Sequence, residues 1–192
     1  HNRSVEMAKK YGVELVVRSS LTSEEGTVVK EVVKMEKMLI TGVAADRNTV
    51  RISAIGVKDE PGIAFKIFNT LAKNNINVDI ILQSVGRNGT KDISFTVSEE
   101  DLKEALAILE EKKEVLTIKE LTYSTDVAKV SIVGAGMLSN PGVAAKMFES
   151  LFNSNININM ISTSEIRITV LIDEKDTEKA MIAIHDGFGL ND

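Results

Sequence analysis

The chain has 192 residues, of which 43% are hydrophobic and 27% charged, so it can hold one medium domain or two small ones of an ordinary globular type. Its net charge of −5 and its 4% aromatic content argue against a nucleic-acid partner, which needs a basic surface or exposed rings for stacking. The chain has no cysteine, which excludes disulfide bonds and thiolate metal sites, and neither a membrane-spanning apolar run nor a signal peptide is evident, so we expect a cytoplasmic protein.

The first 30 residues predict a small mixed segment. Residues 3–11 have the pattern of a helix, residues 13–17 that of a strand, and residues 22–27 form a polar stretch. A further strand is expected at 38–44, where β-branched and small apolar residues alternate.

The rest of the sequence repeats itself at a spacing of 80 residues. The match begins at Pro61-Gly62 and Pro141-Gly142 and continues through Leu71 and Leu151, Asn75 and Asn155, Ile81 and Ile161, and Ser84 and Ser164. Farther on, 92–97 resembles 165–170, and 101–105 resembles 176–180. Such an ordered series indicates two homologous modules.

Each copy predicts the same elements in the same order. A strand (50–55 or 127–133) is followed by a turn, an N-cap (Asp59 or Asn140) and a helix whose apolar residues recur at helical spacing. An asparagine-rich turn ends each helix, and a hairpin follows, formed by a strand (78–85 or 156–161), a turn (87–89 or 162–164) and a second strand. A second helix is expected at 99–112 and 173–185.

Strand counting gives the topology. Residues 116–123 complete a βαββαβ unit in the first copy, whereas the second copy has no such ending. The economical solution is that the early strand completes the second unit. We therefore predict an α+β fold of two ferredoxin-like modules with antiparallel four-stranded sheets, the first at 48–123 and the second at 37–46 together with 126–188.

The Pro-Gly turns are candidate ligand sites. A helix start exposes unpaired N–H groups and the positive end of the helix dipole, which suit a carboxylate, and Gly62 and Gly142 leave room for a small ligand to approach. Asp59 could pair with an ammonium group, Gln83 could hydrogen-bond to a hydroxyl or an amine on the ligand side chain, and Glu165 could pair with a cationic side chain. For each of these the plainer interpretation, a helix start or a solvated strand end, stays open.

Catalysis and metal binding have little support. Only His1 and His185 are present, so no Ser/His/Asp set can be assembled, and metal-ligand spacing is absent. Val133-Gly134-Ala135-Gly136 follows a strand as a dinucleotide-binding turn would, but the third glycine is missing. A dinucleotide-binding fragment and a pure dimerisation module remain the alternatives to a regulatory binding module.

Several segments together resemble aspartate kinases. They are Val17-Arg18-Ser19-Ser20, Gly42-Val43-Ala44, Asp59-Glu60-Pro61-Gly62, Asn77-Val78-Asp79, Gln83, Ser131-Ile132-Val133-Gly134-Ala135-Gly136-Met137 and Ile161-Ser162-Thr163-Ser164-Glu165-Ile166. The resemblance covers essentially the whole chain. It implies that the repeats are ACT modules, that residues 1–30 are the end of a kinase catalytic domain plus a linker, and that this region has no catalytic residues, no metal and no cofactor of its own.

The resemblance also implies a function. The parent enzyme would phosphorylate the aspartate carboxylate with ATP and Mg, and this region would bind threonine, lysine or both in feedback control of lysine and threonine biosynthesis. ACT modules usually pair side by side, which implies a homodimer in contact with a kinase domain or subunit. The implied effector-binding residues are Asp59, Gly62, Ile63, Ala64, Asn77, Val78, Asp79, Gln83, Gly142, Val143, Ala144, Asn157, Ile158, Ser164 and Glu165.

Overall fold

The computed structural model describes residues 2–21, 25–29, 40–134 and 140–190, and the chain divides into two compact units, His1–Met38 and Leu39–Asp192. The smaller unit has a helix, α1 (Asn2–Tyr11), and an antiparallel hairpin of β1 (Leu15–Val17) and β2 (Thr27–Val29). Gly12 ends α1 in the left-handed region, at φ 63°, which glycine adopts without strain. The predicted helix and first strand are present, whereas β2 was not predicted.

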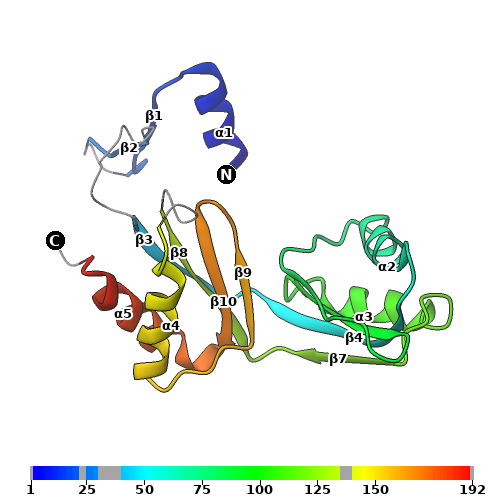
Figure 1. Ribbon diagram of the computed structural model, residues 1–192. Coiled ribbons are helices and arrows are strands. Elements are labelled where there is room, and N and C mark those ends of the chain that lie inside the picture. The colour runs from blue at the N-terminus through cyan, green and yellow to red at the C-terminus, as the bar shows by residue number, and fades with distance from the viewer. Residues whose placement is uncertain (1, 22–24, 30–39, 135–139, 191–192) are drawn as a thin grey trace. The chain divides into compact units, whose positions relative to one another are not determined.

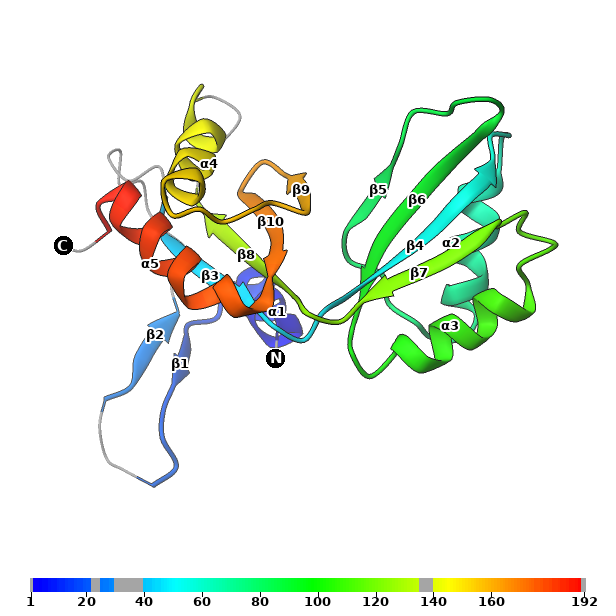
Figure 2. The same ribbon diagram turned by 90° about the horizontal axis from the view of Figure 1, so that it is seen from below.

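The first module of the larger unit is a complete βαββαβ fold (Figure 1). Its strands are β4 (Val50–Lys58), β5 (Ile81–Gln83), β6 (Thr90–Val97) and β7 (Glu120–Ser124), in the order β5-β6-β4-β7, and all neighbours are antiparallel. The helices α2 (Ile63–Ala72) and α3 (Leu102–Glu111) cover one face of this sheet and leave the other face open (Figure 2).

The second module has the same architecture but takes one strand from earlier in the chain. Its sheet has the order β3-β8-β10-β9, from β3 (Gly42–Asp46), β8 (Val127–Val133), β9 (Met160–Thr163) and β10 (Arg167–Asp173). A short 3-10 helix (Glu174–Asp176) leads into α5 (Thr177–Phe188), which lies beside α4 (Val143–Asn153) on one face. Ala44 pairs with Ser131, so β3 occupies the edge that β7 occupies in the first module.

Each module has its own core between the sheet and its two helices. In the first module Ile52 and Phe95 of the sheet meet Ile67 and Leu71 of α2, and all four are fully buried. The second core is built in the same way from Val130, Ile132, Met147, Leu151, Val170 and Ile184. Each such side chain contributes about 1.5 to 3 kcal/mol on burial, so these cores hold the modules together.

The sheets exclude the dinucleotide-binding alternative. A doubly wound dinucleotide fold needs a parallel sheet, whereas every strand pair of both modules is antiparallel. Residues 135–139 of the glycine-containing turn lie outside the described residues.

The predicted N-caps are wrong. The residues at the N-cap positions of α2 and α4 are Gly62 and Gly142, and not Asp59 and Asn140. The reason is that the Pro-Gly turn places the cap beyond Asp59, whose backbone N–H instead donates to the carbonyl of Gly89, at 2.8 Å. The asparagine turns are confirmed, because Asn75 and Asn155 have φ values of 58° and 52° after the two helices.

The alignment of the second hairpin strands also needs correction. Gln83 lies opposite Ile93 in the first module, and Thr163 lies opposite Ile168 in the second. Since Gln83 and Thr163 are 80 residues apart, the strand 92–97 corresponds to 167–172 and not to 165–170. The predicted second turn at 162–164 is shifted for the same reason: Ser162 and Thr163 belong to β9, and the turn runs from Ser164 to Arg167.

Candidate functional site

Both Pro-Gly turns present a helix start whose glycine cannot be replaced without strain. Gly62 has φ 88° and Gly142 has φ 98°, both in the left-handed region that side chains with a Cβ rarely adopt. A Cβ built on either glycine meets no atom within 4 Å. The space over each helix start is therefore open, and the glycine is required by the backbone conformation.

In the first module the turn exposes donors. The first amides of a helix have no intrahelical acceptor, and those of Ala64 and Phe65 have no backbone acceptor among the described residues. Ile63, beside them, is fully buried in the core and fixes the helix start in place. This arrangement suits a carboxylate at the end of the helix dipole.

Asp59 is held beside this turn by residues 84–91 of the β5–β6 hairpin, which we call the hairpin arm. Lys91 places its ammonium group 2.7 Å from Oδ1 of Asp59, and the Lys91 side chain is only 11% exposed. A Cβ at Gly86 would collide with Oδ2 of Asp59, so the glycine lets the hairpin approach the carboxylate. The Asp59 carboxylate is fixed and still partly exposed, as a receptor for an ammonium group requires.

A second charge group beside the turn was missed in the sequence. Glu60 pairs with Lys58 at 2.8 Å and with Lys66 at 3.2 Å. The hydrogen bond from Lys58, and then that from Lys66, lower the pKa of Glu60, and the bond to Glu60 raises the pKa of Lys58. The sequence does place a glutamate at 60 between lysines at 58 and 66, and this arrangement of opposite charges could have predicted the ion pairs.

The strand segment that was expected to contact the ligand is only partly free to do so. Asn77 is exposed and Val78 packs on the core, but the carboxylate of Asp79 is 2.7 Å from the ammonium group of Lys129 in the second module. Lys129 also lies 2.8 Å from Asp46. No local pattern predicts this contact, because Lys129 is one polar residue in an alternating strand.

Gln83 lies on the face of the sheet that α2 covers. It directly opposes Ile93, a core residue, so the two side chains project to the same face. Gln83 is exposed at the sheet edge and has no hydrogen-bond partner in the described part of the chain. Its amide is therefore available to a ligand at the neighbouring helix start.

The second site is described only from Asn140 onward. Val143 is buried in the core, Ala144 and Ile158 pack partly against it, and Asn157 is exposed. Residues 135–139, which precede the Pro-Gly turn, lie outside the described residues.

The hairpin next to the second site is shorter than in the first module. The backbone N–H of Ser164 donates to the carbonyl of Arg167 at 2.7 Å, and its hydroxyl donates to the same carbonyl at 3.2 Å. Glu165 therefore stands at the tip of a two-residue turn, where it is exposed. The side chain of Asn159, the counterpart of Asp79, donates to Asp173 of its own module at 3.1 Å.

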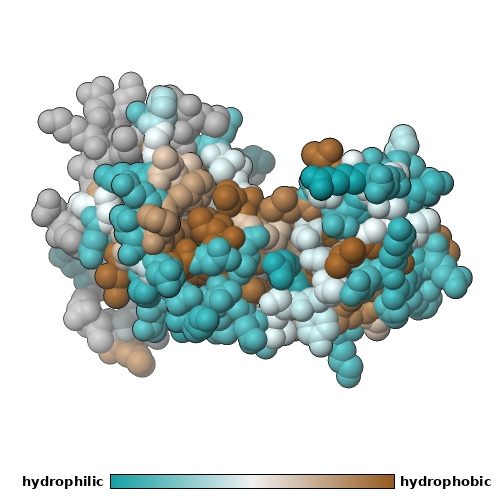
Figure 3. All heavy atoms as spheres, turned by 60° about the horizontal axis from the view of Figure 1, so that its bottom comes forward, coloured by the Kyte–Doolittle hydropathy of each residue, from teal (hydrophilic) through white to brown (hydrophobic). Residues whose placement is uncertain are grey.

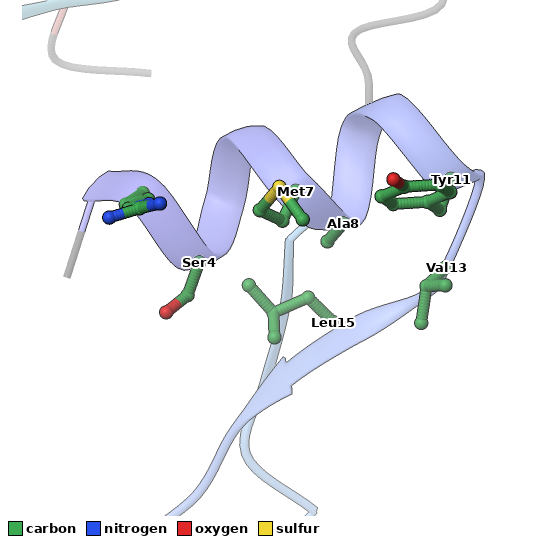
Figure 4. A pocket seen from close by; sticks show the side chains of 7 residues that line it. Ser4, Met7, Ala8, Tyr11, Val13 and Leu15 are labelled. Atoms are coloured by element: carbon green, nitrogen blue, oxygen red, sulfur yellow. The ribbon is translucent and has the colours of Figure 1, made fainter.

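The described residues also line hollows away from the two turns. One of about 590 Å³ lies in the smaller unit, where Met7 and Tyr11 of α1 face Val13 and Leu15 (Figure 4). One of about 200 Å³ lies on the open face of the second sheet, around Lys129 and Arg167, and one of about 770 Å³ is lined by Arg47, Ser124, Asp126, Asp173, Glu174, Lys175 and Glu178.

Within the described residues no group of three or more His, Asp or Glu side chains is placed to hold a metal ion. No helix of the described part is long and apolar enough to cross a membrane.

Comparison with known proteins identifies the modules. A family model described as "ACT domain" matches residues 50–112 and 130–188. The aspartokinase of Bacillus sp. (strain MGA3) is 46% identical over the whole chain, which spans 47% of that relative, so the chain has about half the length of the curated relatives it matches.

Two solved structures cover the two modules. A structure described as aspartokinase alpha and beta subunits is 47% identical, with a TM-score of 0.73, and a ligand-free regulatory subunit of aspartate kinase from Thermus thermophilus is 43% identical, with a TM-score of 0.74. Each comparison covers 78% of this chain and 99% of the other. The likeness to a regulatory subunit therefore extends over nearly all of that subunit.

Proposed function

The chain belongs to the aspartokinase family, whose regulatory region with two ACT domains it contains, and from this premise we propose that it binds threonine, lysine or both and controls the kinase activity of the parent enzyme. The observation that supports effector binding is the pair of open Pro-Gly helix starts at equivalent places in the two modules. A single open helix start would be an ordinary turn, whereas two that both keep a left-handed glycine suggest a retained binding role.

A free amino acid fits the first site in three parts. Its carboxylate would accept hydrogen bonds from the amides at Ala64 and Phe65, and its ammonium group would lie near Asp59, which Lys91 fixes in place. The side-chain amide of Gln83 would then hydrogen-bond to the side chain of the ligand. An amide suits a hydroxyl, so this module favours threonine.

The second site would differ in its ligand. Glu165 offers a carboxylate at the hairpin tip, which favours lysine, and Ser164, Asn157 and the turn from Gly142 to Ala144 would complete the site. Because Thr163 replaces Gln83 and Asn159 replaces Asp79, the two sites are not chemically equivalent.

Two edge strands suggest how copies of the chain associate. β5 and β9 each lie at the edge of a sheet, with one side unpaired, and Ile81, Leu82 and Ile161 on them are exposed. Hydrophobic residues also reach the surface elsewhere on the face that Figure 3 shows. We therefore propose a homodimer in which modules pair side by side through these edges.

The smaller unit is proposed to belong to the kinase domain. Tyr11 and Val13 beside its hollow are 65% and 61% exposed, which is expected of a surface that packs against the rest of a domain (Figure 4). In the parent enzyme that domain would bind ATP, Mg and aspartate, and the regulatory region would contribute no catalytic group.

A thermal-shift screen over the twenty amino acids tests the function. A ligand at 100 times its Kd stabilises the native state by about 2.7 kcal/mol, and this raises the melting temperature by about 5 to 10 °C for a chain of this size. Threonine or lysine should give this shift, and glycine and alanine should not. Equal melting temperatures with all twenty would refute effector binding.

Calorimetry on Asp59→Asn then tests the site. Loss of a charged hydrogen bond should weaken binding about tenfold. The matched control is Glu104→Gln, which neutralises an exposed carboxylate on α3, away from the turn. Unchanged affinity in Asp59→Asn would place the ammonium group elsewhere.

A further inference from the structure

One lysine joins three separate segments of the larger unit. The ammonium group of Lys129, on β8, lies 2.8 Å from Asp46 on β3 and 2.7 Å from Asp79, which precedes β5 in the first module. The Lys129 side chain is only 13% exposed, whereas the two aspartates are 50% and 41% exposed. An ion pair is worth little on an open surface, but two carboxylates around one largely covered ammonium group form a stronger network.

A bulge brings Asp79 to this contact. The N–H of Asp79 donates to the carbonyl of Thr96 at 3.1 Å, and the N–H of Thr96 donates to the carbonyl of Ile80 at 3.0 Å. Asp79 and Ile80 therefore both lie opposite Thr96. Two residues opposite one is the pattern of a β-bulge, which changes the direction in which side chains project. The N–H of Ile80 also donates to the hydroxyl of Thr96, at 3.0 Å, so the bulge is held at both residues.

Ile80 adds an apolar contact beside the ion network. It is 5% exposed and clusters with Val127, Met160 and Leu171, which come from the second module. Leu171 lies between the core residues Val170 and Ile172, so it projects to the opposite, open face of its sheet. The bulge thus docks two adjacent residues, one charged and one apolar, on the second module.

The two modules can be superposed by their cross-strand hydroxyl pairs. Ser53 and Ser94 are 2.8 Å apart in the first sheet, and Ser131 and Thr169 are 2.8 Å apart in the second. Each pair lies at the corresponding position of its two central strands, which fixes which residues are counterparts.

Among the described residues, only the first module has this ion network with its neighbour. By this correspondence the counterpart of Lys129 is Arg51, and that of Asp79 is Asn159. Arg51 has no carboxylate partner in the described part of the chain, and Asn159 is bonded to Asp173 in its own module. Because the two modules share one backbone fold, the second module could have formed the same contact. The contact at Asp79 therefore distinguishes the segment 77–79 of the first module from its counterpart, 157–159, in the second.

The position of Asp79 gives this contact a consequence for ligand binding. Asp79 directly follows Asn77 and Val78, the segment that would face an effector at the first Pro-Gly turn. We propose that Lys129 is a positioning residue for the first effector site: from the second module it holds Asp79, and through it the segment 77–79, in the geometry that receives the effector. This inference rests on the proposed effector binding and adds a residue of the other module to it.

The same contact makes the coupling reciprocal. If holding Asp79 favours effector binding, then a bound effector must favour the contact between Asp79 and Lys129 by the same factor. Asp46 extends the contact to β3, the first strand of the larger unit. Effector occupancy would therefore strengthen the docking of the two modules on each other.

The decisive experiment uses Lys129→Met, which keeps most of the unbranched side chain and removes its charge. Hydrogen exchange of the Asp79 and Ile80 amides, measured without ligand, should accelerate about tenfold, because both amides bond to Thr96 inside the bulge. Threonine and lysine affinities are then measured by calorimetry, and the affinity for whichever binds the first module should fall about fivefold or more.

Two further variants separate positioning from simple stabilisation. Lys129→Arg should restore the affinity, because it keeps a positive charge between Asp46 and Asp79. The matched control, Arg51→Met, removes the counterpart charge and should leave exchange at Asp79 and effector affinity within about twofold, because substitutions away from an ion network have small effects. A purely structural role would lower the melting temperature in Lys129→Met and leave the affinity of the folded protein unchanged.

The outcomes distinguish the two proposals. If the unmodified chain binds neither threonine nor lysine, the proposed function fails and the effector part of this inference fails with it. If exchange at Asp79 and Ile80 is the same in Lys129→Met as in the unmodified chain, the positioning role is refuted, whatever the chain binds.

Discussion

The two modules share a backbone and differ in what surrounds their helix starts. In the first, a long hairpin arm brings Lys91 and Gly86 against Asp59, and Gln83 lies at the sheet edge. In the second, the hairpin closes in a two-residue turn directly after Ser164, so no equivalent arm exists. The duplication has preserved the glycine-capped helix start and changed the side chains around it. Under the proposed effector binding, one scaffold would be kept for the ligand carboxylate and its surroundings would be adapted to two ligand side chains.

The largest effect should come from matched core substitutions in the two modules. Leu71→Ala and Leu151→Ala each remove a fully buried leucine from equivalent helix positions, and each should lower the free energy of unfolding by about 2 to 5 kcal/mol. Urea denaturation monitored by circular dichroism measures the loss. If only one of the two variants were destabilised, the modules would not be packed equivalently.

The two glycine caps should respond alike. Gly62→Ala and Gly142→Ala place a Cβ at a positive φ, which costs about 1 to 2 kcal/mol, and neither Cβ meets another atom. The loss should therefore be nearly equal, and thermal unfolding gives both values. A clear difference between them would show that one turn relaxes to another conformation.

The ion network predicts a difference between the modules that depends on pH. Burial lowers the pKa of Lys129, but hydrogen bonds and charge from Asp46 and Asp79 outweigh it and hold the pKa above its ordinary 10.5. A raised lysine pKa stabilises the folded state fully below pH 10.5, and this stabilisation is lost as the pH rises through the folded-state pKa.

The measurement is the difference in unfolding free energy between the unmodified chain and Lys129→Met. It should be about 1 kcal/mol at neutral pH and should shrink above pH 10.5. The facing charged groups are Asp46, Asp79 and, across the hollow, Arg167. Arg51→Met, in the first module, should show no such pH-dependent difference.

The smallest effect should come from the two sheet-edge side chains. Gln83→Ala should weaken threonine binding about fivefold, because a neutral hydrogen bond is worth about 1 kcal/mol, and it should leave stability unchanged. Thr163→Ala, at the counterpart position, should leave threonine binding unchanged. Calorimetry measures the threonine affinity of both variants. If Thr163→Ala weakened threonine binding and Gln83→Ala did not, threonine would bind the second module and not the first.

The repeat made most of the fold predictable. The spacing of Ile63, Ile67 and Leu71 predicts one buried helix face, and the structure has it in both modules. The early strand also pairs with β8, as strand counting requires, although the strand is 42–46 and residues 38 and 39 of the expected range lie outside the described residues. Periodicity is local, so it can be recognised in one sequence.

The contacts that were missed join residues far apart in the chain. Asp59 was expected to cap a helix, but its partners Lys91 and Gly89 come from the hairpin arm. Lys129 and Asp79 are 50 residues apart and belong to different modules. No local pattern encodes how two modules are docked, so neither contact could be read from residue spacing. The effector-binding residues remain predictions, supported by their placement around the two turns.

The position of β3 makes the first module an insertion within the second. The chain enters the first module at β4 and leaves it at β7, and Arg51 and Ser124 lie opposite each other, so entry and exit are adjacent. Asp46 likewise lies opposite Lys129, so β3 and β8 are antiparallel neighbours on either side of the insert. A chain with residues 48–125 deleted and a short turn in their place would join β3 to β8 as an ordinary hairpin. The first module therefore occupies, in the chain, the place of the loop that would join β3 to β8 of the second module.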